Sequence, residues 1–289
     1  MYYLQLILNG LIAGGVYALF AVGLTMVYGT FRFINFAHGE LIAWGAYGVL
    51  LFASEPIGLP LWAAALPAVA LTCAIGLAQD RFVYKPLKDS HAVTLLISSI
   101  GLSFFLRSLL VLCFGSDLMT YGAGISEGYE IFGLVVTKVQ LGMLGMALLF
   151  MFGLYLLFTR TLLGKALRAV SDSQELALIY ALPMKKVRLA VWILASFFAA
   201  SGGIMQGLDT SLEPMMGLTN LIKAFAAVLL GGAGNVFGAL IGGVFIGVAE
   251  NLSIAFFDPG YKDFIAFSVI ILMLLVRPQG IFAVGGGVR

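Results

Sequence analysis

Two charged residues, Lys223 and Glu250, stand inside long apolar stretches of the sequence. A charge at membrane depth is costly, so such residues usually pair with each other or line a polar path. An ion pair between Lys223 and Glu250 would neutralise both charges. The alternative is that one of the two lines a path for a transported molecule, and the sequence alone allows both.

A second polar group interrupts an apolar stretch at Asn35, His38 and Glu40. Such an interruption is typical of either a turn at the membrane surface or a broken helix beside a substrate path. A further cation, Arg107, stands near the end of its own apolar stretch. We expect its side chain to extend to the membrane surface, where the guanidinium stays in water.

The sequence holds no pattern typical of an enzyme. The phosphate-binding pattern G-x-x-x-x-G-K-[ST] is absent, because Gly164-Lys165 is followed by Ala166. The two histidines, His38 and His91, lack the partners that zinc motifs require. We therefore expect no catalytic residue, no metal ion and no cofactor in this chain. If ATP drives its activity, another chain hydrolyses that ATP.

These residues belong to a chain whose composition suits lipid. Apolar residues make up 61% of the sequence and charged residues only 10%, against about 25% in soluble domains. A helix crosses the bilayer with about 20 mostly apolar residues. Nine candidate crossings satisfy this, at residues 4–28, 34–53, 59–79, 92–114, 139–159, 189–208, 218–230, 236–257 and 264–276.

The seventh and ninth of these segments are short, which is typical of tilted or broken helices. The sequence therefore predicts an all-α polytopic membrane protein with about eight to nine transmembrane helices, some of them short or broken. We expect residues 1–289 to form one transmembrane domain, with a cytoplasmic segment at about residues 160–188.

The orientation follows from the basic residues, which concentrate in cytoplasmic loops. On the predicted cytoplasmic face fall 12 of the 16 Lys and Arg residues: Arg32, Arg81, Lys85, Lys88, Arg160, Lys165, Arg168, Lys185, Lys186, Arg188, Arg277 and Arg289. The opposite face collects acidic residues: Glu55, Asp117, Glu127, Glu130, Asp209, Glu213, Asp258 and Asp263. We expect the N-terminus outside and the C-terminus in the cytoplasm.

Small residues at helical spacing predict where helices meet closely. Gly234, Gly238 and Gly242 form a double small-xxx-small repeat, and Gly243 and Gly247 begin another. Such stripes let helix backbones approach each other in lipid. The first stripe is either a packing seam only or a seam beside a substrate route.

The basic segment at residues 160–188 has the pattern of short amphipathic helices. Asp172, with Glu175 three residues later, resembles the start of a second short helix. On this helix Leu176 and Ala177 are the candidates for a face that becomes buried against a docking partner, with Glu175 at its rim and Arg168 before them. The segment either lies on the lipid headgroups or docks against a soluble partner.

Three stretches resemble the permease subunits of bacterial ABC importers for branched-chain amino acids, specifically the smaller, H-type (LivH-like) subunit. They are YGTFRFINFAHGE at residues 28–40, AFAAVLLGGAGNVFGALIGG at residues 224–243, and residues 261–281, which begin YKDF and end VRPQGI. Together with residues 164–182, the similarity runs almost from end to end.

The resemblance implies a permease of the bacterial inner membrane that moves branched-chain or related hydrophobic amino acids. It also implies a second, paralogous permease subunit, two ATP-binding subunits and a periplasmic substrate-binding protein as partners, and no nucleic acid. Residues 168–182 would then be the segment that couples to an ATPase. Two alternatives are an ABC permease for urea or short amides and a stand-alone channel or secondary carrier.

Overall fold

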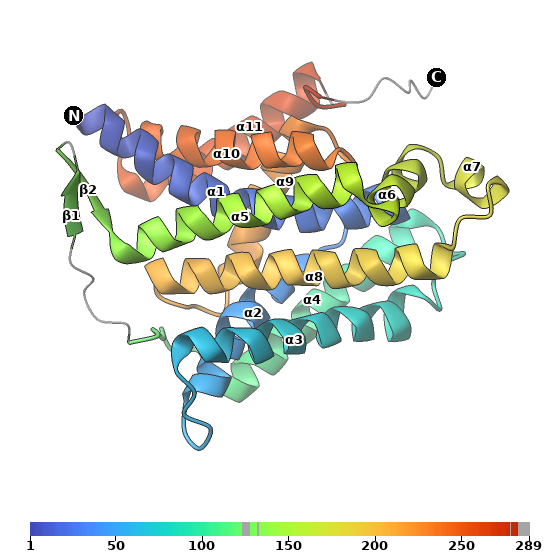
Figure 1. Ribbon diagram of the computed structural model, residues 1–289, viewed down its shortest axis with the longest axis horizontal. Helices are drawn as coiled ribbons and strands as arrows, with labels where there is room; N and C mark the ends of the chain where they lie inside the picture. The colour runs from blue at the N-terminus through green and yellow to red at the C-terminus, as the bar shows by residue number, and fades with distance from the viewer. Residues whose placement is uncertain (123–127, 132, 278, 283–289) are drawn as a thin grey trace.

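Long apolar helices make up most of the chain in the computed structural model, which describes residues 1–122, 128–131, 133–277 and 279–282 (Figure 1). Within these residues, seven helical segments are long and apolar enough to cross a membrane. They contain α1 (Tyr2–Phe31), α3 (Leu61–Gln79, extended by a π-helical turn at Asp80–Tyr84), α4 (Ala92–Phe114), α5 (Lys138–Arg160), α8 (Met184–Asp209), α10 (Val236–Ser253) and α11 (Lys262–Val276, preceded by a 3-10 turn at Pro259–Tyr261).

Two further apolar helices, α2 (His38–Ala53) and α9 (Met216–Gly231), contain only 16 residues each. With the seven longer segments they account for the nine predicted crossings, so the predicted all-α polytopic class is confirmed. The second predicted crossing covers residues 34–53, whereas the helix itself begins only at His38. Glu127 and Arg289, assigned above to opposite faces, lie outside the described residues.

The bundle has two different ends (Figure 1). At the hairpin end, β1 (Gly128–Ile131) pairs antiparallel with β2 (Leu134–Thr137), and Gln5 of α1 exchanges two hydrogen bonds with the backbone of Val135. At the α6–α7 end lie α6 (Leu162–Asp172) and α7 (Gln174–Ile179). The N-terminus lies at the hairpin end, whereas residues 280–282 contact the turn between α9 and α10 at the opposite end.

Helix α1 is the central element of the bundle. It packs against α8, α9 and α10, and 83% of its most apolar stretch is buried. Only 11% of the most apolar stretch of the α11 segment is buried. Helix α11 therefore lies at the periphery and presents apolar side chains such as Leu275 outward. A helix face made of outward-facing apolar side chains favours an apolar surrounding, and the hydrocarbon core of a bilayer supplies one.

Glycines form the seam between α1 and α10. A Cβ on Gly247 would overlap the backbone of Gly14, and a Cβ on Gly243 would overlap that of Ala18. On α10, Gly238 and Gly242 meet the backbone of α9 in the same way. The predicted close packing at these two glycines is therefore present.

The first member of the predicted stripe, Gly234, does not belong to it. It lies in the turn before α10 with a φ of +93°, and its neighbours are Gly29 and Ser171. The reason is that Asn235 caps α10 by accepting a hydrogen bond from the N–H of Gly238, so the helix begins only at Val236.

Enlarging a seam glycine should separate the helices. In Gly238→Leu, the side chain would overlap the carbonyl of Gly231, and we expect a loss of stability of about 3 kcal/mol or more. The matched control is Gly145→Leu, because a Cβ at Gly145 of α5 meets nothing within 4 Å. Thermal unfolding in detergent should show a much lower melting temperature for Gly238→Leu. Equal melting temperatures for the two variants would show that the seam is not tightly packed.

Candidate functional site

The start of α2 lies inside the bundle. Nε2–H of His38, its first residue, donates a hydrogen bond to the carbonyl oxygen of Phe20 at 3.2 Å. Phe20 precedes the end of α1 by 11 residues, or about 16 Å at 1.5 Å per residue. The chain therefore turns back from Phe31 into the bundle before α2 begins. Of the two alternatives for this polar interruption, the structure shows a broken helix.

The non-helical stretch before α2 has its backbone groups bonded by side chains. The side-chain oxygen of Asn35 accepts two hydrogen bonds, one from the backbone N–H of Ala37 (3.0 Å) and one from the hydroxyl of Tyr84 (2.8 Å). Ser99 of α4 accepts from the N–H of Phe36 at 3.1 Å. Asn35 bonds the backbone two residues ahead, which competes with helix formation and delays the start of α2.

The first turns of α2 and α9 touch each other. A Cβ on Gly39 would overlap the carbonyl of Gly217, and one on Gly217 would lie 2.7 Å from the carbonyl oxygen of Gly39. Helix α9 then runs to the α6–α7 end, whereas α2 runs to the opposite end of the bundle. The two short helices thus begin next to each other inside the bundle and run in opposite directions. The positive N-terminal ends of both helix dipoles therefore lie side by side.

Glu40 supplies negative charge at this junction. Its Oε1 accepts hydrogen bonds from Ser103 (2.8 Å) and from Arg107 (2.6 Å), and its side chain is 1% exposed. Arg107 was expected to reach the membrane surface, and that expectation is wrong. The guanidinium turns inward and pairs with the buried carboxylate, which would otherwise be left as an uncompensated buried charge.

Of the two alternatives for Lys223 and Glu250, the structure shows the ion pair. Nζ of Lys223 lies 3.5 Å from Oε2 of Glu250, 3.0 Å from Oδ1 of Asp263 and 3.2 Å from the hydroxyl of Tyr17. Sequence reasoning placed Asp263 on the outer face and missed its bond to Lys223. The single cation therefore balances two carboxylates, one buried and one half-exposed.

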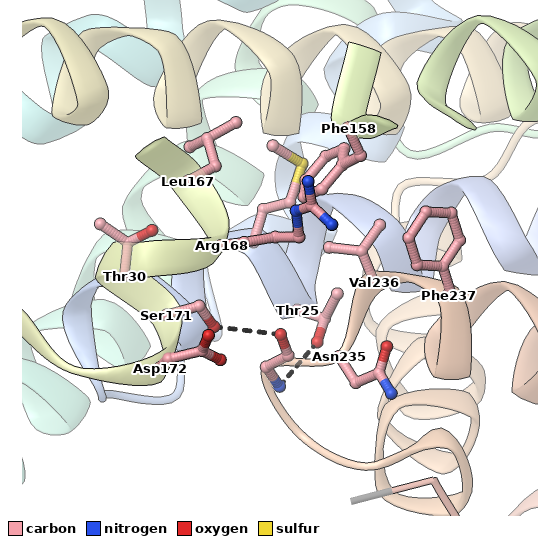
Figure 2. Close-up of a pocket in the computed structure, with 12 residues that line it drawn as sticks. Thr25, Thr30, Phe158, Leu167, Arg168, Ser171, Asp172, Asn235, Val236 and Phe237 are labelled. Atoms are coloured by element: carbon pink, nitrogen blue, oxygen red, sulfur yellow. Dashed lines mark hydrogen bonds between the residues drawn. The ribbon is translucent and has the colours of Figure 1, made fainter. Parts of the chain in front are cut away.

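At the α6–α7 end, a cavity of about 350 Å³ separates α6 from the turn that leads into α10 (Figure 2). Two hydrogen bonds cross beside it. The hydroxyl of Ser171 on α6 donates to the carbonyl of Gly234 (3.1 Å), and the N–H of Gly234 donates to Thr25 of α1 (2.9 Å). Arg32 also donates to the carbonyl of Ser171. A chain of direct bonds thus joins α6, the glycine turn and α1.

Three of the predicted coupling residues are exposed at this end. Arg168 and Asp172 line the cavity, and Glu175 follows in α7. Asp172 does not start the second helix as predicted. It is the last residue of α6, and α7 is a separate helix of six residues. The side chain of Leu176 lies outside what the structure describes.

Ala177 does not face outward as a partner contact. It is only 2% exposed and belongs to the core of this chain. Three exposed apolar residues follow it directly, Leu178, Ile179 and Tyr180, and Ile179 is 75% exposed. Ala177 is therefore unavailable to a partner, because its side chain packs inside this chain. We call residues 178–180 the α7 tip.

A helical bundle built around two broken helices, with lipid-facing leucines and short helices at one end, defines a multi-pass membrane permease. The chain belongs to the family described as branched-chain amino acid transport system / permease component, whose match spans residues 6–274. The resemblance found in the sequence is therefore confirmed, and the chain is a multi-pass transport subunit of the inner membrane.

Relatives match along almost the full length. The high-affinity branched-chain amino acid transport system permease protein BraD of Pseudomonas aeruginosa is 34% identical, over 97% of this chain and 95% of the relative. LivH of Escherichia coli K12 is 34% identical over 97% and 96%. The ribose import permease protein RbsC of the same strain is 29% identical over 90% and 81%.

One solved structure, PsaBC from Streptococcus pneumoniae in complex with Fab, shares the fold. Its TM-score is 0.53 at 15% identity, over 96% of this chain and 93% of that one. At this identity the likeness concerns the fold alone.

The Lys223 cluster predicts an order of stability losses. Lys223→Met strands a buried carboxylate and should cost about 3 kcal/mol or more. Glu250→Gln should cost less, because Lys223 keeps Asp263, and half-exposed Asp263→Asn should cost least. The double variant Lys223→Met/Glu250→Gln should be more stable than Lys223→Met alone. Thermal unfolding in detergent gives the order, and a double variant less stable than both singles would contradict it.

Proposed function

We propose that this chain is the permease subunit of an ABC importer that moves branched-chain or related hydrophobic amino acids across the inner membrane. The observation that carries the proposal is the match to BraD and LivH over almost the whole of both chains. RbsC, whose name specifies ribose, is less similar and matches a smaller share of the chain. That difference favours amino acids over sugars.

The proposal includes partners and an orientation. The partners are a paralogous second permease, two ATP-binding subunits and a periplasmic substrate-binding protein. The α6–α7 end faces the cytoplasm, since the basic residues Lys165, Arg168, Lys185 and Lys186 lie there. In this orientation the α7 tip projects toward the ATPase, and its motion passes through Ser171 and Gly234 to α1 and α10.

Uptake measurements distinguish the candidate substrates and mechanisms. The chain, co-expressed with the proposed partners in a strain lacking other branched-chain uptake, should accumulate radiolabelled L-leucine but not ribose or urea. Inactivating the partner ATPase should abolish that uptake. Leucine uptake that persists without ATP hydrolysis would favour a secondary carrier. Urea uptake without leucine uptake would favour the amide permeases.

The α7 tip should be the ATPase contact. Truncating or charging one well-buried interface residue typically costs about 2 kcal/mol or more, which is roughly a 30-fold loss of affinity. Ile179→Asp should therefore prevent co-purification with the ATPase in detergent while the permease itself keeps its melting temperature.

The contrast variant is Ala177→Asp, which places a charge in the core of the chain and should lower the melting temperature of the permease alone. If Ile179→Asp still co-purifies with the ATPase at normal stoichiometry and supports leucine uptake, the α7 tip is not the docking surface.

A further inference from the structure

A polar cavity of about 250 Å³ opens near the hairpin end, between α1, α5, α8, α10 and α11. Asn9 and Tyr17 of α1 both line it and are eight residues apart, so it extends about 12 Å along that helix. Its volume is below the roughly 300–1,000 Å³ of pockets for drug-sized ligands. A small metabolite is therefore the appropriate size of ligand.

Two opposite charges line this cavity. Asp209 ends α8 and Lys262 begins α11. Among the described side chains, neither forms an ion pair, and the only hydrogen bond of Asp209 is a long one of 3.5 Å from Gln140. The carboxylate and the ammonium lie more than 4.0 Å apart, since they do not pair with each other. Both groups line the same cavity, so each is available to a ligand that carries an ammonium and a carboxylate.

The remaining lining completes a site for an amino acid. Ile12, Val16 and Met143 form an apolar wall that can hold a hydrocarbon side chain. The side-chain carbonyl oxygen of Gln206 is buried and has no hydrogen-bond partner among the described residues, so it can accept from a ligand ammonium. A sugar or a neutral amide carries no charge that could pair with either group.

We propose that this cavity is a binding site for a zwitterionic amino acid with an apolar side chain. Asp209 and Gln206 bind its ammonium group, and Lys262 binds its carboxylate. Tyr17 lines the cavity and accepts a hydrogen bond from Lys223, so an occupied site is linked to the buried ion pair through Tyr17. The proposal rests on the proposed function, because it specifies where within this subunit the transported class is held.

The test uses the full chain in nanodiscs and three radiolabelled probes. They are L-leucine, 4-methylpentanoate, which lacks the ammonium, and 3-methylbutylamine, which lacks the carboxylate. Asp209→Asn should weaken L-leucine binding at least about tenfold, as expected for the loss of a charge-assisted hydrogen bond, and leave 4-methylpentanoate binding unchanged. Lys262→Met should weaken L-leucine similarly and leave 3-methylbutylamine unchanged. Asp117→Asn, outside the cavity, is the matched control and should change nothing.

A misfolded variant should bind none of the three probes, whereas a folded variant that lacks one charge should still bind the probe that does not need that charge. The site is wrong if wild-type chain binds no L-leucine, or if both variants bind it like wild type. Leucine uptake by the wild-type complex is measured in parallel. Uptake without binding in the cavity overturns the site and leaves the proposed function standing, whereas absence of leucine uptake overturns the proposed function itself.

Discussion

The structure depends on one constraint, which is that a helix beginning inside a membrane must have its free N–H groups and its dipole compensated by protein. Helices α2 and α9 begin next to each other at Gly39 and Gly217, where only glycine permits this approach. Glu40 places a carboxylate at the paired N-termini, and Arg107 balances that carboxylate. The broken helices and this ion pair therefore stabilise each other, and neither is stable in lipid alone.

This junction determines how the rest of the bundle is arranged. Because α9 starts halfway along the bundle and runs to the α6–α7 end, it ends at the glycine turn that bonds to Ser171 and Thr25. Direct hydrogen bonds thus join α6 to α1, the central helix, and to the turn between α9 and α10. The seam of α1 against α10 has no room for larger side chains at Gly243 and Gly247, so the two helix backbones pack in close contact.

Much of this fold could be predicted from the sequence, because apolar segments, basic loops and the Lys223–Glu250 pair have local or strongly periodic signals. The missed features depend on tertiary contacts. Nothing near Arg107 in the sequence indicates that Glu40 lies beside it. Asn35 delays the start of α2 by accepting a hydrogen bond from the N–H of Ala37, and the spacing of apolar residues does not predict that bond. The sequence predicted short helices in this segment, but the burial of Ala177 in the core of this chain depends on tertiary contacts that the local pattern does not contain.

A double-mutant cycle on Glu40 and Arg107 tests the central claim most directly. The free energy of unfolding in detergent is measured for wild type, Glu40→Gln, Arg107→Met and the double variant. Each single variant leaves a buried charge unpaired and should lose about 3 kcal/mol or more, whereas the double variant should be more stable than either. Losses that simply add in the double variant would show that the two residues act independently, and that the junction of α2 and α9 is stabilised by something else.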